Sequence, residues 1–234
     1  MRSPRRFATP ARPAAPSANP AGCTSAPPAW TTRATSACLD KLRGQDEPFF
    51  TSVAEFTAST IETTLGRYDQ ALRHLSKSRV LADETGIGWL AAGVWVQQGI
   101  LQVLQGKSDE AQPVLAEALS LSLAARSTQW TALSLAGHAR LALATGDARR
   151  AARLAGAAQG LRLRVGLQAW PIIRQNEAEL VAQVRLALGE EQFDRAFADG
   201  SALSQQEAVA AARADPTAAA LQGARNRLGP AFRS

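Results

Sequence analysis

Three segments of the chain repeat at a fixed spacing: IETTLGRYDQALRHL at 61–75, LQVLQGKSDEAQPVL at 101–115 and LALATGDARRAARLA at 141–155. Each contains one glycine, 40 residues from the next, and these are Gly66, Gly106 and Gly146. An alanine follows each glycine by five positions, and a leucine follows it by fifteen. A repeat of this length is typical of stacked two-helix hairpins. The repeat therefore predicts an all-α solenoid of antiparallel helix hairpins, an architecture that presents an extended binding surface.

The apolar periodicity predicts where the helices begin and end. Three hairpins are expected, and each has two helices joined at its glycine. The predicted helices span 51–66 and 68–85, 89–105 and 109–125, and 129–145 and 148–165. A further helix is expected over 171–188, because proline suits the first position of a helix. A short helix over 190–199 and one last helix complete the prediction.

Residues at the predicted helix ends support these boundaries. Each repeat glycine stands where a helix ends and the chain turns, a position that favours a positive φ. Ser108 and Asp147 are expected to cap the second helices of their hairpins. Ser204 and Glu207 have the spacing of a capping box at the last helix. Pro113 lies past the first turn of its helix, so we expect it to remove a hydrogen bond and bend the helix slightly.

The repeat domain is expected over 49–213, between two segments of different composition. Residues 1–48 hold eight of the twelve prolines, so we expect this leader to be disordered. Residues 214–234 are expected to form a flexible basic tail. Residues 1–39 carry five arginines and no acidic residue, which leaves 21 basic and 20 acidic residues in the rest of the chain. The repeat domain is therefore close to neutral, and we do not expect this chain alone to bind nucleic acid.

The sequence also bears on location. No apolar run reaches the roughly 18 residues of a membrane span. The longest, 89–104, is interrupted by three glutamines. The leader is rich in arginine and superficially resembles an organelle transit peptide. We prefer to interpret it as a leader without a targeting role, or as an extension from a misassigned start site. We therefore expect a cytoplasmic protein with no membrane partner.

No set of residues predicts catalysis or a bound cofactor. The sequence QGKS at 105–108 resembles the end of a phosphate-binding loop, but that motif requires a glycine where Leu101 stands. The two cysteines lie in the leader, and His74 and His138 have no cysteine or carboxylate set at ligand spacing. We therefore expect that the protein is not an enzyme, that it binds no cofactor and that it has no metal site.

A binding surface is expected on the concave face formed by the first helix of each hairpin. Its candidate residues are polar or aromatic side chains of these helices: Trp95, Gln97, Gln98, Gln102, Trp130, Ser134 and His138. Aromatic side chains often dominate binding energy, but Trp89, together with Trp130 and Trp170, which are 40 residues apart, also fits a role as a cap of the core between hairpins. The expected occupant of the concave face is a protein partner or a small-molecule inducer.

The 40-residue period resembles a long variant of the tetratricopeptide repeat. Residues 148–209 resemble the C-terminal helical region of large actinobacterial regulators, which are signal-transduction ATPases with such repeats that often end in a LuxR-type DNA-binding domain. The likeness covers roughly residues 50–213 and rests on these motifs: Arg153-Leu154-Ala155-Gly156-Ala157-Ala158, Leu188-Gly189, Phe193, Ala196-Phe197, Gly200, Leu203 and Glu207-Ala208.

In that family an upstream module hydrolyses ATP, the repeats sense an inducer or a partner protein, and a terminal helix-turn-helix binds DNA. This sequence has no Walker loop, and no Leu-Thr-x-Arg-Glu start of a LuxR-type domain follows Val209. The resemblance therefore implies the sensor or scaffold part of a transcriptional regulator, without catalytic residues. Two alternatives stay open: a DNA-associated regulator that acts through its basic ends, and a truncated gene fragment without independent function.

Overall fold

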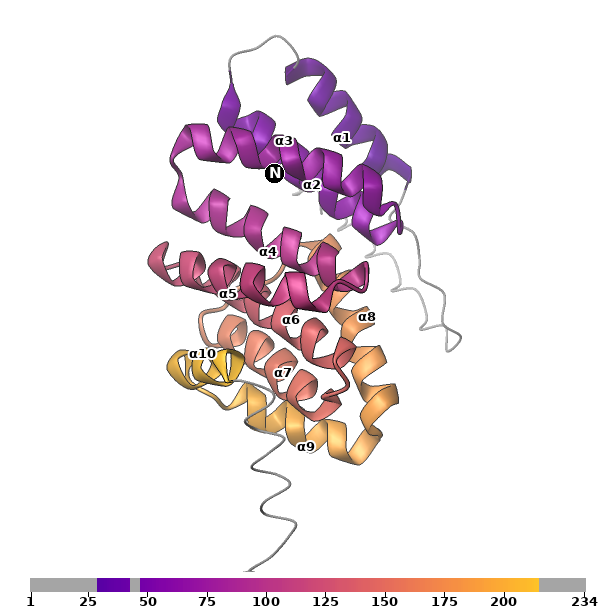
Figure 1. Cartoon of the computed structure of the whole chain (residues 1–234), viewed down its shortest axis with the longest axis vertical. Helices are drawn as coiled ribbons and strands as arrows, with labels where there is room; N and C mark the ends of the chain where they lie inside the picture. Colours follow the sequence, from indigo (N-terminus) through magenta and orange to yellow (C-terminus); the bar gives the residue numbers. More distant parts are fainter. Residues whose placement is uncertain (1–28, 43–46, 215–234) are drawn as a thin grey trace, which may run out of the picture.

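A computed structural model describes residues 29–42 and 47–214, and every regular element in this part of the chain is an α-helix. Six of these helices form three antiparallel hairpins that stack in chain order (Figure 1). Their bounds are α2 Pro48–Thr64, α3 Tyr68–Thr85, α4 Gly88–Leu104, α5 Ser108–Ala124, α6 Thr128–Ala144 and α7 Ala148–Arg164. The predicted all-α stack of hairpins is confirmed, and each predicted helix is present to within a few residues.

The N-terminal part differs from the prediction in one helix. α1 spans Ala29–Leu42 and packs against α2, although disorder was predicted for all of 1–48. The distribution of the prolines explains the difference. None occurs between residues 29 and 47, so a helix can continue there. The rest of the predicted leader, 1–28 and 43–46, and the predicted tail beyond Ala214 lie outside the described residues.

The repeat glycines turn the chain within each hairpin. Gly66, Gly106 and Gly146 have φ values of 72°, 77° and 87°, in the left-handed region that glycine enters without strain. Asp147 caps α7 as predicted, since its side chain accepts a hydrogen bond from the backbone N–H of Arg150. The prediction for Ser108 is wrong, because the helix begins at this residue and Lys107 takes the N-cap position.

Three further helices complete the chain: α8 Pro171–Leu188, α9 Glu190–Ser201 and α10 Gln205–Arg213. α8 packs against the first helices α2 and α6 as well as against α7, and it runs along the side of the stack in Figure 1. The first helices also contact one another in order, α2 with α4 and α4 with α6, so they form the inner side of the stack. α8 therefore lies across the face of the first helices where the sequence predicted the binding surface.

α9 and α10 both pack against α7, and they do not form a further hairpin of the repeat. Arg164 donates hydrogen bonds to the backbone carbonyls of Ser201 and Leu203, at the end of α9. Arg150 donates in the same way to Ala212 and Ala214, at the end of α10. Cations suit the free carbonyls at a helix C-terminus. The arginines of α7 thus anchor the last two helices, and the predicted capping box at Ser204 and Glu207 is present.

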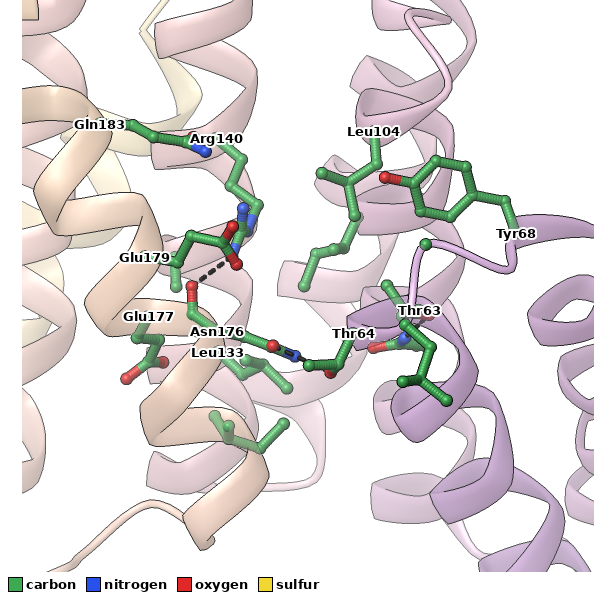
Figure 2. Close-up of a pocket in the computed structure, with 16 residues that line it drawn as sticks. Thr63, Thr64, Tyr68, Leu104, Leu133, Arg140, Asn176, Glu177, Glu179 and Gln183 are labelled. Atoms are coloured by element: carbon green, nitrogen blue, oxygen red, sulfur yellow. Dashed lines mark hydrogen bonds between the residues drawn. The ribbon is translucent and has the colours of Figure 1, made fainter. Parts of the chain in front are cut away.

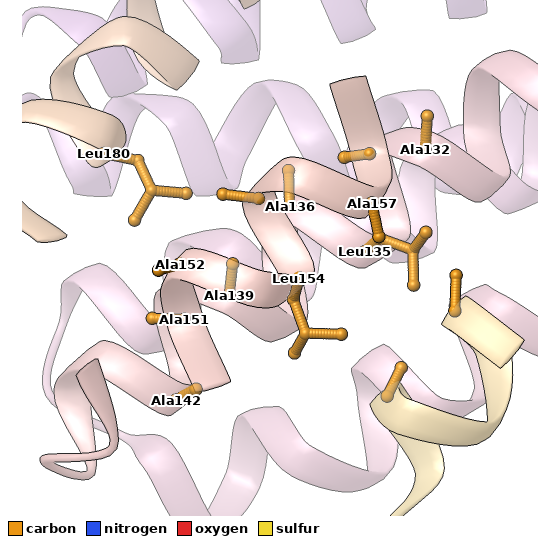
Figure 3. Packing of buried hydrophobic residues seen from close by; sticks show 14 of the residues in the cluster. Ala132, Leu135, Ala136, Ala139, Ala142, Ala151, Ala152, Leu154, Ala157 and Leu180 are labelled. Carbon is orange, nitrogen blue, oxygen red and sulfur yellow. The ribbon is translucent and has the colours of Figure 1, made fainter. Parts of the chain in front are cut away.

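Small side chains fill the core between the helices. The repeat alanines Ala71, Ala111 and Ala151 are all 0 % exposed, each at the start of a second helix. Figure 3 shows the alanine-rich cluster between α6 and α7, where Leu135 and Leu154 supply the larger side chains. Short side chains allow the helices of a hairpin to approach closely, and dense packing of this kind stabilises the stack.

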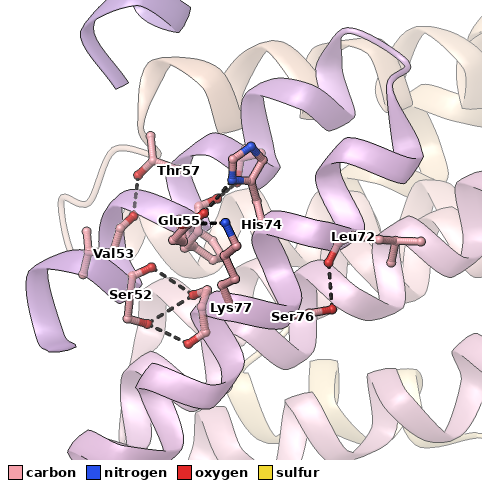
Figure 4. A network of polar contacts seen from close by, with 11 residues as sticks. Ser52, Val53, Glu55, Thr57, Leu72, His74, Ser76 and Lys77 are labelled. Carbon is pink, nitrogen blue, oxygen red and sulfur yellow. Dashed lines mark hydrogen bonds and ion pairs between the residues drawn. The ribbon is translucent and has the colours of Figure 1, made fainter. Parts of the chain in front are cut away.

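Polar contacts also join the first hairpin. Ser52 and Ser78 exchange hydrogen bonds between hydroxyl and backbone carbonyl, at 2.8 and 2.9 Å (Figure 4). Glu55 on α2 contacts His74 Nδ1 at 2.5 Å and Lys77 Nζ at 3.7 Å, both from α3. His74 thus has a partner that accounts for its polar side chain within a packed face.

Within the described residues, no helix is long and apolar enough to cross a membrane.

Candidate functional site

A pocket of about 320 Å³ lies on the inner side of the stack, between α8 and the first helices of the three hairpins. Figure 2 shows its lining side chains converging from these four elements and from the start of α3. Such a volume is at the lower end of pockets that hold small organic molecules. The pocket exists because α8 crosses the inner side without filling it.

Asn176 of α8 joins the two ends of the stack at one edge of the pocket. Its side-chain oxygen accepts a hydrogen bond from the Thr64 hydroxyl at 2.9 Å, and Thr64 ends α2. Its backbone carbonyl accepts a hydrogen bond from Nη2 of Arg140 on α6. Residues 112 positions apart in sequence therefore meet here, and they hold α8 against both the first and the third hairpin.

The inner wall of the pocket combines a buried amide with apolar side chains. Gln97 is 3 % exposed and donates a hydrogen bond to the hydroxyl of Thr63 at 2.9 Å. The amide of Gln97 has lost its contacts with water on burial, and this bond replaces one of them. The apolar lining residues include Ile100, Leu104, Leu133 and Ile173.

The charged groups of the pocket come from α6 and α8. Burial lowers the pKa of Arg140 below its ordinary value, and Glu179 and then Glu177 oppose that shift. The Arg140 guanidinium nevertheless remains protonated at neutral pH, because an arginine side chain keeps its proton in proteins. Glu177 already has a partner, since Arg162 donates to both of its oxygens at 2.6 and 2.7 Å. Arg140 and Glu179 are left as the cation and the anion of the pocket without a direct ion pair in the described part of the chain.

Only Gln97 of the seven residues predicted for the binding surface lines this pocket. Trp95 and Gln98 instead meet Arg79 of α3. The guanidinium carbon lies 4.4 Å from the centroid of the indole ring, and Arg79 Nη1 donates to the Gln98 amide oxygen at 3.1 Å. Both side chains therefore contact α3, a second helix, and neither lines the pocket.

Trp130 and Ser134 are core residues. Trp130 is 4 % exposed and packs edge-to-face with Phe56 and Trp170, with ring centroids 5.5 and 5.6 Å apart. Ser134 is 0 % exposed and shares a hydrogen bond with the Ser122 hydroxyl at 3.1 Å. Their predicted role in the surface is wrong, and the alternative interpretation of Trp130 as a cap of the inter-hairpin core is the correct one.

His138 and Gln102 complete the predicted set. Gln102 is half-buried on α4, outside the pocket, and its side-chain oxygen has no hydrogen-bond partner within the described residues. His138 lies in a second cavity of about 150 Å³, between α5, α6 and the end of α10. Burial lowers the pKa of His138, a backbone hydrogen bond to Ser134 opposes that shift, and Arg150 and Arg213 add to it. His138 and Gln97 thus belong to opposite sides of the stack.

The sequence contains a signal for one residue that the prediction missed. Arg140 stands in the repeat register of Ile100 and Thr60, so a charged residue occupies an inward position of the first helices. Glu179 and Asn176 had no such signal, because α8 is not part of the 40-residue repeat. Their place in the site depends on how α8 packs on the stack.

Within the described residues, the pocket offers one cation and one carboxylate that lack an ion-pair partner, together with an apolar wall, and this suits the binding of a small molecule. Within residues 29–42 and 47–214, no three His, Cys, Asp or Glu side chains are grouped to hold a metal ion.

No family model, curated protein or solved structure matches the chain.

Proposed function

We propose that this chain is a non-enzymatic helical repeat module that binds a small molecule in the pocket between α8 and the first helices. The observation that carries the proposal is the pair of charges at Arg140 and Glu179, which lie in one pocket without a direct ion pair in the described part of the chain. Both side chains are half-buried, and partial removal of a charge from water is costly unless the charge is paired. A ligand that pairs with both groups offsets that cost.

We further propose that ligand binding reports to a larger regulatory system, as the sensor or scaffold part of a tetratricopeptide-type transcriptional regulator in the cytoplasm. The support is the resemblance carried by residues 148–209. The position of α8 is compatible with such a role, since α8 contacts the first and the third hairpins through Asn176. A ligand beneath α8 would change how firmly that helix holds the hairpins together. A protein partner remains the alternative occupant of the inner side.

Native mass spectrometry tests the binding proposal. The full chain is dialysed against the small-molecule fraction of a bacterial extract and then desalted, and we expect a retained adduct and a higher melting temperature. Glu179→Gln should reduce the adduct, because it removes the pocket carboxylate with little change in size. Glu191→Gln is the matched control, since Glu191 forms an exposed ion pair with Arg195 on α9. Equal loss in both variants, or no adduct together with no rise in melting temperature in the presence of added ligand, would overturn the proposal.

A second candidate function is DNA association through the basic ends. The observation in its favour is the charge distribution, with five arginines and no acidic residue in 1–39. Phosphate-driven binding weakens steeply as salt rises. A gel shift at low salt that disappears at higher salt, and that is lost on removal of 1–28, would support this candidate, whereas no shift at low salt would exclude it.

A further inference from the structure

We infer that the ligand of the pocket beneath α8 is a free apolar amino acid, a small zwitterion with a carboxylate, an ammonium group and an apolar side chain. This inference rests on the proposed binding function and specifies its ligand. Arg140 would receive the carboxylate, Glu179 the ammonium group, and the apolar wall the side chain.

The donors of Arg140 favour a carboxylate. A guanidinium carries five N–H donors, and the structure assigns one nitrogen, Nη2, to the carbonyl of Asn176. The other side of the planar group can therefore bind a carboxylate in the bidentate manner typical of arginine. Holding Nη2 on the α8 backbone also fixes the orientation of the group, so less side-chain entropy is lost on binding.

The acidic side chains of the pocket exclude a simple anion as the best ligand. Glu179 and Glu177 both line the pocket, and Glu177 alone has a bonded cation, Arg162. A phosphate or a fatty acid bound at Arg140 would therefore stand close to the free carboxylate of Glu179, and like charges disfavour that arrangement. A simple cation would meet the reverse problem at Arg140. A zwitterion satisfies both charged groups in one molecule.

The remaining walls favour an apolar side chain of modest size. Ile100, Leu104 and Leu133 line the pocket, and Figure 2 shows Leu104 beside the ring of Tyr68. Burial of an aliphatic or aromatic side chain against them removes apolar surface from water. A volume of about 320 Å³ accommodates an amino acid and leaves little room for a longer peptide.

A panel of the twenty common L-amino acids provides the test. Each is added at millimolar concentration to the full chain, and the melting temperature is measured. We expect at least one apolar amino acid, with leucine, isoleucine and phenylalanine as the first probes, to raise it by several degrees. The matched carboxylic acid without the amine, and the matched amine without the carboxylate, should each lose at least tenfold in affinity by calorimetry.

Two variants locate the effect. Glu179→Gln should weaken the amino acid at least tenfold and should strengthen the deaminated acid, because it removes the like charge beside the ligand carboxylate, whereas Glu191→Gln on α9 should change neither. Arg140→Lys keeps the charge and removes the fork, so it should also weaken the carboxylate-bearing ligands while the chain remains folded.

The outcomes separate this inference from the proposed function. If the extract yields an adduct but no amino acid binds, the zwitterion assignment is wrong and the proposed binding function stands. If the deaminated acid binds as tightly as the amino acid, the role of Glu179 is wrong. If neither the extract nor the panel yields a ligand, both proposals fail.

Discussion

Arg126 adopts a conformation that the repeat otherwise reserves for glycine. Gly86, Arg126 and Gly166 are 40 residues apart and end the second helix of each hairpin, with φ values of 64°, 51° and 66°. A residue with a side chain is strained in this left-handed region by roughly 1–2 kcal/mol. The turn between α5 and α6 therefore carries backbone strain that the other two turns do not.

Arg126→Gly should relieve this strain and raise the free energy of unfolding. Glycine has more freedom in the unfolded chain, which offsets part of the gain, so we expect a net increase of about 0.5–1 kcal/mol. Chemical denaturation measures the difference. Arg126→Ala keeps the Cβ and should leave stability nearly unchanged, and a glycine variant no more stable than the alanine variant would contradict this account.

His138 should make stability depend on pH. Its pKa in the folded protein is below the ordinary value of 6.5, so the unfolded state binds the proton more readily. The contribution of His138 to the free energy of unfolding is therefore fully present above pH 6.5. It is lost as the pH drops below that value, by at most about 1.4 kcal/mol per pH unit. His138→Gln should flatten this part of the profile in denaturation experiments from about pH 7 to pH 5. An unchanged slope would show that His138 is not responsible.

At the scale of elements, α7 and α9 are in backbone contact. A Cβ on Gly156 would lie 2.1 Å from the carbonyl oxygen of Phe197, and a Cβ on Gly200 would lie 1.9 Å from that of Arg153. Backbone atoms cannot move aside without separating the two helices. The glycines of α7 and α9 are therefore required by close approach, unlike the glycines in the hairpin turns.

Gly156→Ala should destabilise the protein by roughly 1–3 kcal/mol, the range for overpacking a dense core. Gly88→Ala is the control, because a Cβ there meets no atom within 4 Å and the residue lies at the start of a helix. Thermal and urea denaturation of the two variants gives the comparison. A loss for Gly156→Ala no greater than for Gly88→Ala would refute the close contact of α7 with α9.

Helix positions were predictable from the sequence because they depend on local signals. The 40-residue period, the turn glycines and Pro171 locate the hairpins and α8 to within a few residues. The orientation of α8 was not predictable in the same way, since it depends on contacts such as Thr64 with Asn176.

The candidate site was predicted poorly because polar character is an unreliable guide to exposure. Ser134 is buried and satisfied by Ser122, and Trp130 occupies space that Gly93 leaves open, since a Cβ there would lie 2.9 Å from the Trp130 ring. Repeat register would have been the better guide, because it places Arg140 with Ile100 on the inner side. Gln97 was the one predicted residue that lines the pocket.

For the molecule as a whole, α8 adds the wall that makes a pocket on the inner side of the stack. The first helices supply the apolar wall and Arg140, α8 supplies Glu179 and Asn176, and neither part forms the pocket alone. The central claim is that a small molecule binds there, between α8 and the hairpins, and not on the opposite side near His138.

Hydrogen–deuterium exchange on the full chain, with and without the ligand retained from the extract, tests that claim most directly. Binding slows exchange in the elements that a ligand holds together. We predict increased protection in α8 and in the halves of α4 and α6 that carry Leu104 and Arg140, with no change in α10. Protection confined to α10 and the His138 cavity, or no change in α8, would contradict the account.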